Sequence, residues 1–391
     1  MKVYYISPST IPSRAANSIH VVNMCEALTQ LGHHVTLFVR SESLNGADFE
    51  KKVQEFYGID TKNIDILAIR CNTTRGIELR ISLQALFRFF QELITLKLPD
   101  IIISRNLYAA VFLGFFLRRK IVYETHAPER GFRKILQGCL VKSGRIPCVV
   151  ISEALRRIIA SLHVKSKKSI IYVMHDAARS EQPLMDETGR RFYRQRYLGP
   201  YLNLSEYDKF VGYFGHLHPG RGIEIIRGIA AEIPRVAFIV YGGNEKNLIK
   251  RREDNNNKNL YFMGHIPPAE VRSAMAMMDI LLMPYQKSVS VGLTDVDTAQ
   301  WMSPMKLFEY MSAGVPIISS DLPVLREVLH DGVNCLLVPP DNVSSWAQAV
   351  NQLLASPDLA VKIRCRAYKQ FLSDYTWYKR ANRMISILMD S

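Results

Sequence analysis

Cysteine is scarce in this chain of 391 residues, and no two cysteines are spaced as a CxxC pair. The six are Cys25, Cys71, Cys139, Cys148, Cys335 and Cys365. This scatter argues against a zinc site and against a disulfide framework, and it fits a reducing compartment such as the cytoplasm. We therefore expect a cytoplasmic protein.

Long hydrophobic runs are also missing. The longest, Leu107 to Leu117, has about half the length that a membrane span needs. The chain opens with a strand-like segment, MKVYYIS, so we expect no signal peptide. A hydrophobic content of 48% with 22% charged residues still allows a sizeable core, and the length suits two domains.

Acidic residues are scarce in the first half of the chain. Residues 1–180 hold 26 Lys and Arg against 14 Asp and Glu, a net charge of +12, whereas residues 181–391 hold 24 against 22, a net of +2. A basic half indicates nucleic acid, an anionic membrane surface or a phosphorylated partner. Two halves with such different charge are expected to face different partners.

Strand-like and helix-like segments alternate along the chain, which is typical of parallel sheets. Lys2–Ser7, the helical pattern of Asn17–Leu31 and the strand at 34–38 form a βαβ opening. Its first loop lacks G-x-G-x-x-G, which weighs against an NAD enzyme. A second series begins at Lys209, and residues 175–178 are predicted to cross between two domains.

One stretch of the second half, SPMKLFEYMSAGVPIISS, predicts a phosphate site. Ser303 suits an N-cap, Pro304 the first helical turn, and Gly314 the helix end, before a buried strand that includes Val315. The free N–H groups at such a helix start would bind phosphate together with Lys306, and a carboxylate one turn on, Glu309, would bind ribose hydroxyls. The alternative is a capped surface helix with an exposed Lys–Glu pair.

Two further segments place candidate residues beyond the ends of strands, where open parallel sheets bind ligands. The glycine-rich turn from Gly215 to Gly222 carries Arg221, which suits a phosphate cradle. His126 follows a strand at Ile121–Glu124. The alternative for His126 is a side chain that only hydrogen-bonds its own loop.

Cations and apolar side chains are interleaved in two segments of the first half. Leu79–Leu98 reads as a helix that carries Arg80 and Arg88 beside three phenylalanines, and the segment after His126 carries five cations around Phe132 and Ile135. This pattern suits shallow insertion into an anionic bilayer. The commoner alternative is a charged helix that packs its apolar side inward.

Taken together, the chain resembles a glycosyltransferase of the GT-B fold, of the retaining family 4. The blocks that carry the resemblance are YETHAPER, VGYFGHLHPGRGIEII, NLYFMGHIPPAEVRSAMAMMDILLMPY and SPMKLFEYMSAGVPIISSDLPVLREVLHDGVNCLLVPPD. The resemblance implies two Rossmann-like domains facing a cleft. We expect the acceptor-side domain at 1–180, with 371–391 packing back on it, and the domain that binds the nucleotide-sugar donor at 181–370.

The resemblance also implies roles for individual residues. His126, Arg221 and Lys306 would form the catalytic group, with His126 near the donor sugar. The donor nucleotide would be bound by Gly212, Gly215, His216, Arg221, Ser303, Met305, Lys306 and Glu309. Gly212 and Gly215 would shape the turn beneath the phosphates, and Glu309 would hold the ribose.

The sequence departs from the family pattern at three places. Trp301 stands where the first glutamate of the E-x7-E motif is expected, so Asp295 or Asp297 could supply a carboxylate to the donor sugar. His216 replaces the usual arginine after the turn glycine. The glycine pair of the first-domain loop is replaced near Ala16 and Asn17.

The expected reaction is retaining sugar transfer without metal or cofactor, because Lys306 and Arg221 already supply positive charge for a departing nucleoside diphosphate. A UDP-sugar is favoured over a GDP-sugar. The acceptor is expected to be a lipid-linked saccharide at the inner face of the plasma membrane, in envelope or capsule assembly. Alternatives are a soluble acceptor, a non-transferase such as an epimerase, and a nucleic-acid binder, for which no recognised module is present.

Overall fold

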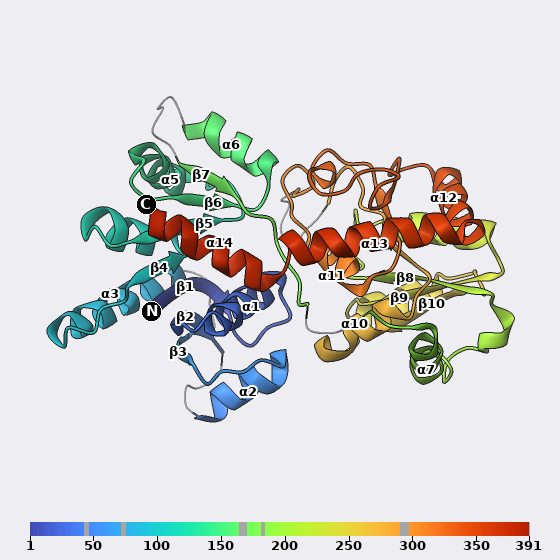
Figure 1. Cartoon of the computed structure of the whole chain (residues 1–391), viewed down its shortest axis with the longest axis horizontal. Coiled ribbons are helices and arrows are strands. Elements are labelled where there is room, and N and C mark those ends of the chain that lie inside the picture. The colour runs from blue at the N-terminus through green and yellow to red at the C-terminus, as the bar shows by residue number, and fades with distance from the viewer. Residues whose placement is uncertain (43–46, 72–75, 164–169, 181–183, 290–296, 391) are drawn as a thin grey trace. The chain divides into compact units, whose positions relative to one another are not determined.

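The chain folds into two compact units. The computed structural model describes residues 1–42, 47–71, 76–163, 170–180, 184–289 and 297–390 (Figure 1). Unit 1 comprises Met1–Asp176 and Trp377–Ser391, and unit 2 comprises Ala177–Thr376. The chain thus passes between the units after Asp176 and again after Thr376.

Unit 1 is built on a parallel sheet of seven strands in the order β3-β2-β1-β4-β5-β6-β7. The strands are β1 Lys2–Thr10, β2 His34–Ser41, β3 Ile64–Arg70, β4 Ile101–Ser104, β5 Ile121–Thr125, β6 Cys148–Val150 and β7 Ile171–Val173. The strand order reverses between β1 and β4. Such a switch point leaves a crevice outside the carboxyl ends of the strands, where ligands of α/β sheets bind.

The helices of unit 1 include the end of the chain. They are α1 Ala16–Gln30, α2 Ala47–Tyr57, α3 Ile77–Ile94, α4 Leu107–Ala109, the π-helix η1 Ala110–Phe116, α5 Gly131–Ser143, α6 Glu153–His163 and α14 Trp377–Asp390. Helix α14 packs against α1 and buries Trp377, Ala381 and Met384 on one face. The C-terminal helix expected to join the first domain is therefore part of unit 1.

A buried carboxylate fastens α3 to the amino end of β1. Glu92 accepts a hydrogen bond of 2.6 Å from the Tyr4 hydroxyl and pairs with Lys2 Nζ at 2.6 Å and with Arg88 Nε at 2.7 Å. A buried carboxylate is tolerated only when its oxygens are satisfied in this way. One face of α3 is thereby fixed against the sheet, and the opposite face stays in solvent.

Unit 2 contains a parallel sheet of six strands in the order β10-β9-β8-β11-β12-β13. The strands are β8 Lys209–Phe214, β9 Val236–Tyr241, β10 Leu260–Gly264, β11 Ile280–Met283, β12 Ile317–Ser320 and β13 Leu336–Val338. The order reverses between β8 and β11, so the turns after these two strands flank the crevice of this sheet.

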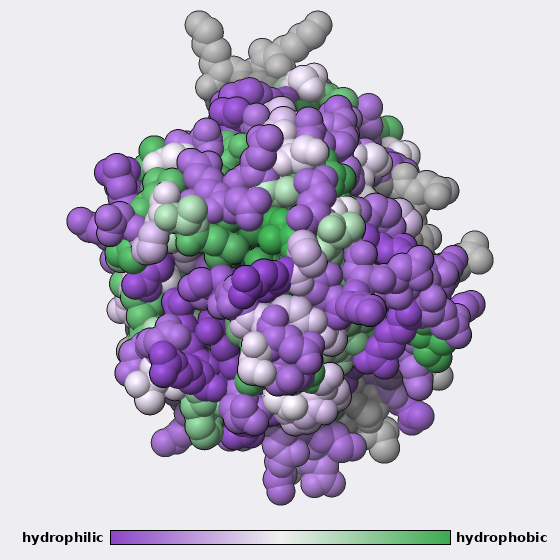
Figure 2. All heavy atoms as spheres, turned by 90° about the vertical axis from the view of Figure 1, so that its right-hand side faces the viewer, coloured by the Kyte–Doolittle hydropathy of each residue, from purple (hydrophilic) through white to green (hydrophobic). Residues whose placement is uncertain are grey.

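The helices of unit 2 cover both faces of this sheet. They are α7 Glu187–Tyr197, η2 Leu204–Glu206, α8 Ile223–Glu232, α9 Glu245–Glu253, α10 Pro268–Ala276, α11 Met305–Ala313, η3 Leu325–Glu327, α12 Val343–Ala355 and α13 Pro357–Asp374. One core cluster joins Phe238 of β9 and Ile226 of α8 to Trp346 of α12. The face of the molecule shown in Figure 2 is mostly hydrophilic, with a hydrophobic area above its centre and further hydrophobic areas nearer its edges.

The start of α11 differs from the sequence prediction by one residue. The helix begins at Met305, and Pro304 takes the N-cap position with φ −74° and ψ 120°, so Ser303 is not the N-cap. The extended ψ of Pro304 places this residue outside the helix. The predicted end is confirmed, because Gly314 has φ +64° and closes α11 in the left-handed conformation. Val315 lies before β12, which begins only at Ile317.

Among the described residues, none of the helices combines the length and the apolar character needed to cross a membrane.

Candidate functional site

In unit 2, the turn after β8 and the start of α11 meet around one buried lysine. Gly215 follows β8 directly, with φ +154°, and a Cβ at this position would lie 2.6 Å from Lys306 Nζ. The turn therefore favours glycine, because side chains rarely adopt this φ and because a Cβ here would require the end of the Lys306 side chain to shift. Two residues far apart in the sequence, both predicted to bind the donor, are in this way brought into contact.

Lys306 is buried and lies against two aromatic rings. Its Nζ is 3.9 Å from the ring centroid of Tyr213 and 5.1 Å from that of Tyr285. The Lys306 side chain is therefore not on the surface, and the alternative of an exposed Lys–Glu pair is wrong. Burial, and then the charge of Arg221, hold the pKa of Lys306 well below its usual range. A negative ligand at this point would favour the charged ammonium form.

One arginine and two histidines of the β8 turn lie near Lys306. The Arg221 guanidinium carbon lies 5.1 Å from the Tyr285 ring centroid, and the rings of His216 and His218 stack at 5.3 Å. Burial and the neighbouring Arg221 lower the pKa of His216 to about 4, so this residue is neutral near pH 7. Glu309 is half-buried one turn into α11. Its negative charge partly offsets the effect of burial and Arg221 on the pKa of Lys306. Lys306 and Arg221 together are suited to bind a compact dianion.

The remaining residues predicted for the donor site have separate surroundings. Gly212 lies inside β8, where a Cβ would meet Met278 and Leu281, so it serves strand packing and does not form the turn. Asp297 Oδ1 accepts hydrogen bonds of 2.9 Å from the backbone N–H groups of Val289 and Ala299.

Two more of these predictions concern the same loop. Trp301 is half-buried, and its backbone N–H donates to the carbonyl of Thr298 at 3.1 Å. Asp295 lies outside the described residues. The hypothesis that Asp295 or Asp297 supplies a carboxylate to the donor sugar stays a prediction.

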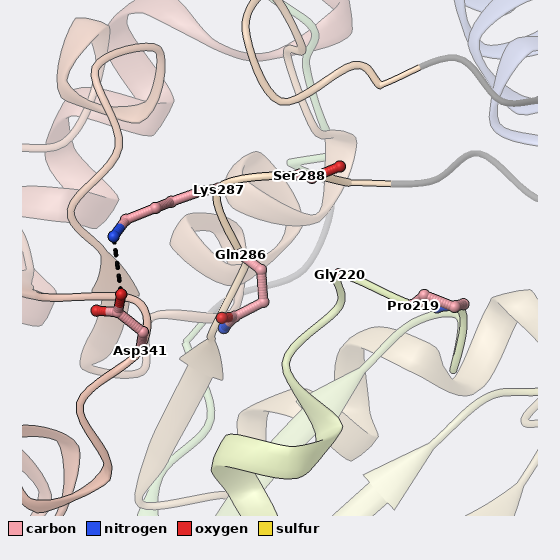
Figure 3. A pocket seen from close by; sticks show the side chains of 6 residues that line it. All are labelled: Pro219, Gly220, Gln286, Lys287, Ser288 and Asp341. Atoms are coloured by element: carbon pink, nitrogen blue, oxygen red, sulfur yellow. Dashed lines mark hydrogen bonds and ion pairs between the residues drawn. The ribbon is translucent and has the colours of Figure 1, made fainter.

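A pocket of about 390 Å³ opens beside the β8 turn, and no residue pattern had indicated it. It is lined by Pro219, Gly220, Gln286, Lys287, Ser288 and Asp341 (Figure 3). Lys287 Nζ and the Asp341 carboxylate pair across one side at 2.7 Å. Because its walls come from the loops after β8, β11 and β13, the pocket belongs to the ligand-binding edge of this sheet.

In unit 1, His126 lies one residue beyond β5 and uses both ring nitrogens. Its Nε2 is 3.0 Å from Glu124 Oε1, and its Nδ1 is 3.2 Å from Arg105 Nη2. Arg105, just beyond β4, also donates through Nη1 to the carbonyl of Asn17 at 3.2 Å. The structure thus brings together His126 and Asn17, both predicted, with Arg105, which was not. Ala16 lies beside Asn17, exposed at the start of α1.

Glu124 is the centre of a buried network behind His126. Besides His126, its Oε1 lies 2.8 Å from Arg380 Nη2 and 3.0 Å from His20 Nε2, and His20 Nδ1 lies 2.7 Å from Asp176. Burial alone would raise the pKa of Glu124, but Arg380 and His20 hold it well below its usual range. Burial and the charge of Arg105 lower the pKa of His126 to about 4. At neutral pH the network therefore holds a carboxylate and a neutral His126.

Three side chains of this network could in principle gather around a metal ion. One atom each of His20, His126 and Asp176 lies within 4.8 Å of the others. The guanidinium groups of Arg105 and Arg380 point into the same network, which disfavours a further cation. His20 Nδ1 already pairs with Asp176 at 2.7 Å and His126 Nε2 with Glu124 at 3.0 Å, and we assign no metal ligands here.

Sequence reasoning missed Glu124, Arg105, His20 and Arg380, although a signal existed for two of them. His20 lies on the apolar face of α1, and Arg380 shares a face of α14 with Trp377 and Met384. A charged or titratable residue on a buried face requires a polar partner. The pattern could have indicated that such partners exist, but not which residues they are.

Family models of known proteins match one segment in each of the two units. A family model described as Glycosyltransferase Family 4 matches residues 18–179, and one described as Glycosyl transferases group 1 matches residues 208–356. The first match covers most of the unit 1 sheet and the second most of the unit 2 sheet.

Curated relatives match over part of their length. Phosphatidyl-myo-inositol mannosyltransferase of Mycolicibacterium smegmatis is 26% identical over 180 residues, which are 45% of this chain and 41% of the relative. The putative teichuronic acid biosynthesis glycosyltransferase TuaH of Bacillus subtilis is 29% identical over 114 residues, 29% of this chain and 27% of the relative. The chain thus spans less than half the length of these two relatives.

The fold matches solved structures over the whole chain. HepE of Anabaena, crystallised in complex with UDP, aligns with a TM-score of 0.72 and 17% identity over 100% of both chains. Together with the two sheets described above, this likeness shows the GT-B fold.

Proposed function

We propose that this chain, a glycosyltransferase of the group 1 and family 4 type, transfers a sugar from a nucleoside-diphosphate sugar to a hydroxyl group of an acceptor. The observation that carries the proposal is Lys306, a buried cation held beside Arg221 at the carboxyl edge of the unit 2 sheet. Buried cations and backbone N–H groups aimed at a departing diphosphate stabilise the charge that develops on it. The UDP complex of HepE favours a UDP-sugar as the donor.

We assign the residues of unit 2 to the nucleotide and those of unit 1 to the sugar. Arg221, Lys306 and the first N–H groups of α11 bind the diphosphate, and Glu309 binds the ribose. The His126 group of unit 1 serves the sugar that is transferred. With this positive charge already present, we propose a metal-independent, retaining reaction in which the acceptor proton passes to the leaving phosphate.

Stabilisation by nucleotides tests the donor site directly. UDP without metal, at about 100 times its Kd, is expected to stabilise the protein by about 2.7 kcal/mol and raise its Tm by roughly 5–10 °C. Glu309→Ala should lose most of this shift, whereas Glu245→Ala, an exposed acid at the start of α9, should keep it. If UDP, GDP and ADP all left the Tm of the wild type unchanged, the proposed donor site would be wrong.

For the acceptor, we propose a lipid-linked saccharide reached from an anionic membrane surface. Twelve of the 24 exposed large hydrophobic side chains in the described part of the chain fall between Leu79 and Ile135. They lie on α3, η1 and α5 or directly after α3 and η1, and η1 contacts both other helices. We call them the α3–α5 face. Its members are Leu79, Leu83, Phe87, Phe90, Leu93, Ile94, Leu96, Phe115, Phe116, Leu117, Phe132 and Ile135.

Exposed cations surround this face. Arg118, Lys120, Arg130 and Lys134 are all exposed. Apolar side chains flanked by cations match the headgroup boundary of an anionic bilayer. This arrangement favours the membrane over the alternative in which the apolar side chains of these segments pack inward.

Vesicle sedimentation tests the α3–α5 face. The wild type is expected to sediment with vesicles that contain anionic lipid and to be released by high salt, because screening weakens the charge attraction. Phe87→Asp combined with Phe116→Asp, both 65% exposed, should lower the bound fraction by about tenfold or more. Phe192→Asp, 59% exposed in unit 2, is the matched control. Equal loss in the control, or no binding by the wild type, would contradict the proposal.

A further inference from the structure

The hydrogen bonds of His126 determine which of its nitrogens carries the proton. Nε2 faces Glu124 Oε1 at 3.0 Å, and a carboxylate only accepts, so Nε2 bears the hydrogen. Nδ1 faces Arg105 Nη2 at 3.2 Å, and a guanidinium only donates, so Nδ1 is bare. His126 is therefore a neutral imidazole with its hydrogen directed inward and its lone pair directed toward Arg105.

The carboxylate that sets this tautomer is itself held from several elements. Arg380 of α14 donates to Glu124 Oε1 at 2.8 Å and also donates through Nε to the carbonyl of His175 at 3.0 Å. His20 of α1 lies 3.0 Å from the same oxygen, and the Tyr5 hydroxyl of β1 donates to Oε2 at 3.4 Å. Glu124 is fully buried and cannot turn away from His126 without breaking its ion pair with Arg380.

The outer side of His126 is less constrained than its inner side. The His126 side chain is 24% exposed, and Arg105 is half-buried. The hydrogen bond from Arg105 to Nδ1 is thus the contact of His126 that a ligand can replace. A hydroxyl group that donates to Nδ1 would take the place of Arg105 Nη2 without disturbing Glu124.

We propose that Glu124 is a positioning residue: it locks His126 as the Nε2–H tautomer, so that Nδ1 accepts a hydrogen bond from a hydroxyl group of the sugar substrate. This inference rests on the proposed function for the identity of the ligand, but the tautomer itself does not depend on activity. In this arrangement His126 recognises a hydroxyl and does not act as the general base, because burial and Arg105 disfavour its protonated form.

The tautomer can be measured without any substrate. Long-range ¹H–¹⁵N NMR of the full chain with ¹⁵N-labelled histidine distinguishes a protonated from a bare ring nitrogen. The wild type is expected to show His126 protonated at Nε2 and bare at Nδ1 near pH 7.5. Glu124→Gln, whose amide both donates and accepts, should convert this to a mixture of the two tautomers.

A second buried carboxylate of unit 1 provides the control. Glu92 of α3 also pairs with two cations, but one of them is Lys2 at the amino end of β1, away from His126, so Glu92→Gln should keep the His126 tautomer of the wild type. Glu124→Asp, which keeps the charge but shortens the side chain, replaces Glu124→Gln if the latter does not fold. The proposal is overturned if wild-type His126 is protonated at Nδ1, or if neither Glu124 variant changes the tautomer.

Kinetics test the link to the sugar. With a UDP-sugar that the wild type transfers, Glu124→Gln is expected to lower kcat/KM by about tenfold or more, because one tautomer presents a donor where an acceptor is needed. His126→Asn, which can place an amide oxygen near the Nδ1 position, should retain more activity than His126→Gln, whose amide reaches the Nε2 position instead. Unchanged kcat/KM in a Glu124 variant with a mixed tautomer would overturn the positioning role. If the wild type transferred no sugar, the proposed function would fail, and the NMR result alone would decide the tautomer.

Discussion

Replacing Lys306 with methionine is expected to lower the kcat/KM of sugar transfer by about two to three orders of magnitude. The ammonium group lies 3.9 Å from the ring centroid of Tyr213 and is buried beside Arg221, in surroundings that exclude water from its charge. Methionine keeps the volume against the two tyrosine rings but removes the charge that faces a departing diphosphate. The effect should appear mainly in kcat, because the negative charge grows on the way to the transition state.

The control for this prediction is another lysine of the same unit. Lys362→Met removes the charge of an exposed side chain on α13, away from the β8 turn and the start of α11, so we expect less than a twofold change in kcat/KM. Initial rates with a UDP-sugar, measured for both variants at saturating acceptor, compare the two. Rates for Lys306→Met within threefold of the wild type would show that Lys306 does not serve the diphosphate.

Replacing Arg380 with methionine is expected to lower the free energy of unfolding of unit 1 by about 3–5 kcal/mol near pH 8. Arg380 is 3% exposed and is the guanidinium closest to the buried Glu124, so its removal leaves a carboxylate buried without its main counter-charge. The protein would respond by raising the pKa of Glu124, and part of the loss would be recovered by protonating the carboxyl group.

The pH dependence distinguishes this cause from a simple packing defect. In the wild type the pKa of Glu124 is held below its unfolded value, so the stability it contributes is present above about pH 4.5 and is lost as the pH falls through the folded pKa. In Arg380→Met the pKa of Glu124 in the folded state is expected to lie above its unfolded value, so the folded state binds the proton more tightly. The difference between variant and wild type should therefore shrink between pH 8 and pH 5.

Hydrogen exchange of the β5 and α14 amides in dilute urea measures this stability for unit 1 separately from unit 2. Arg383→Met, an exposed position on the same helix, should change the stability by less than about 0.5 kcal/mol at either pH. A loss in Arg380→Met that is the same at pH 8 and pH 5 would argue that packing, and not the charge of Glu124, is responsible.

Much of the fold could be predicted from residue patterns. The helical pattern of Asn17–Leu31 corresponds to α1 Ala16–Gln30, the strand predicted at Ile121–Glu124 lies within β5, and Gly314 ends α11 as its position indicated. These features depend on local physics, namely helical periodicity and the ability of glycine to adopt positive φ. No element was predicted for residues 39–78, where the structure forms α2 and β3. At the start of α11 the local signals competed, and Pro304 took the N-cap position that Ser303 was expected to fill.

The sequence by itself determined the alternation of strands and helices and the candidates Lys306, Arg221 and His126, because strand ends and glycine-rich turns are visible as residue types. Only the tertiary structure decided what surrounds them. Lys306 is buried against tyrosines of β8 and of the loop after β11, and His126 is held by a carboxylate whose counter-ion, Arg380, is 256 residues away. Such partners follow from the order of strands in the sheet and from the return of the chain to unit 1, and no local spacing encodes either.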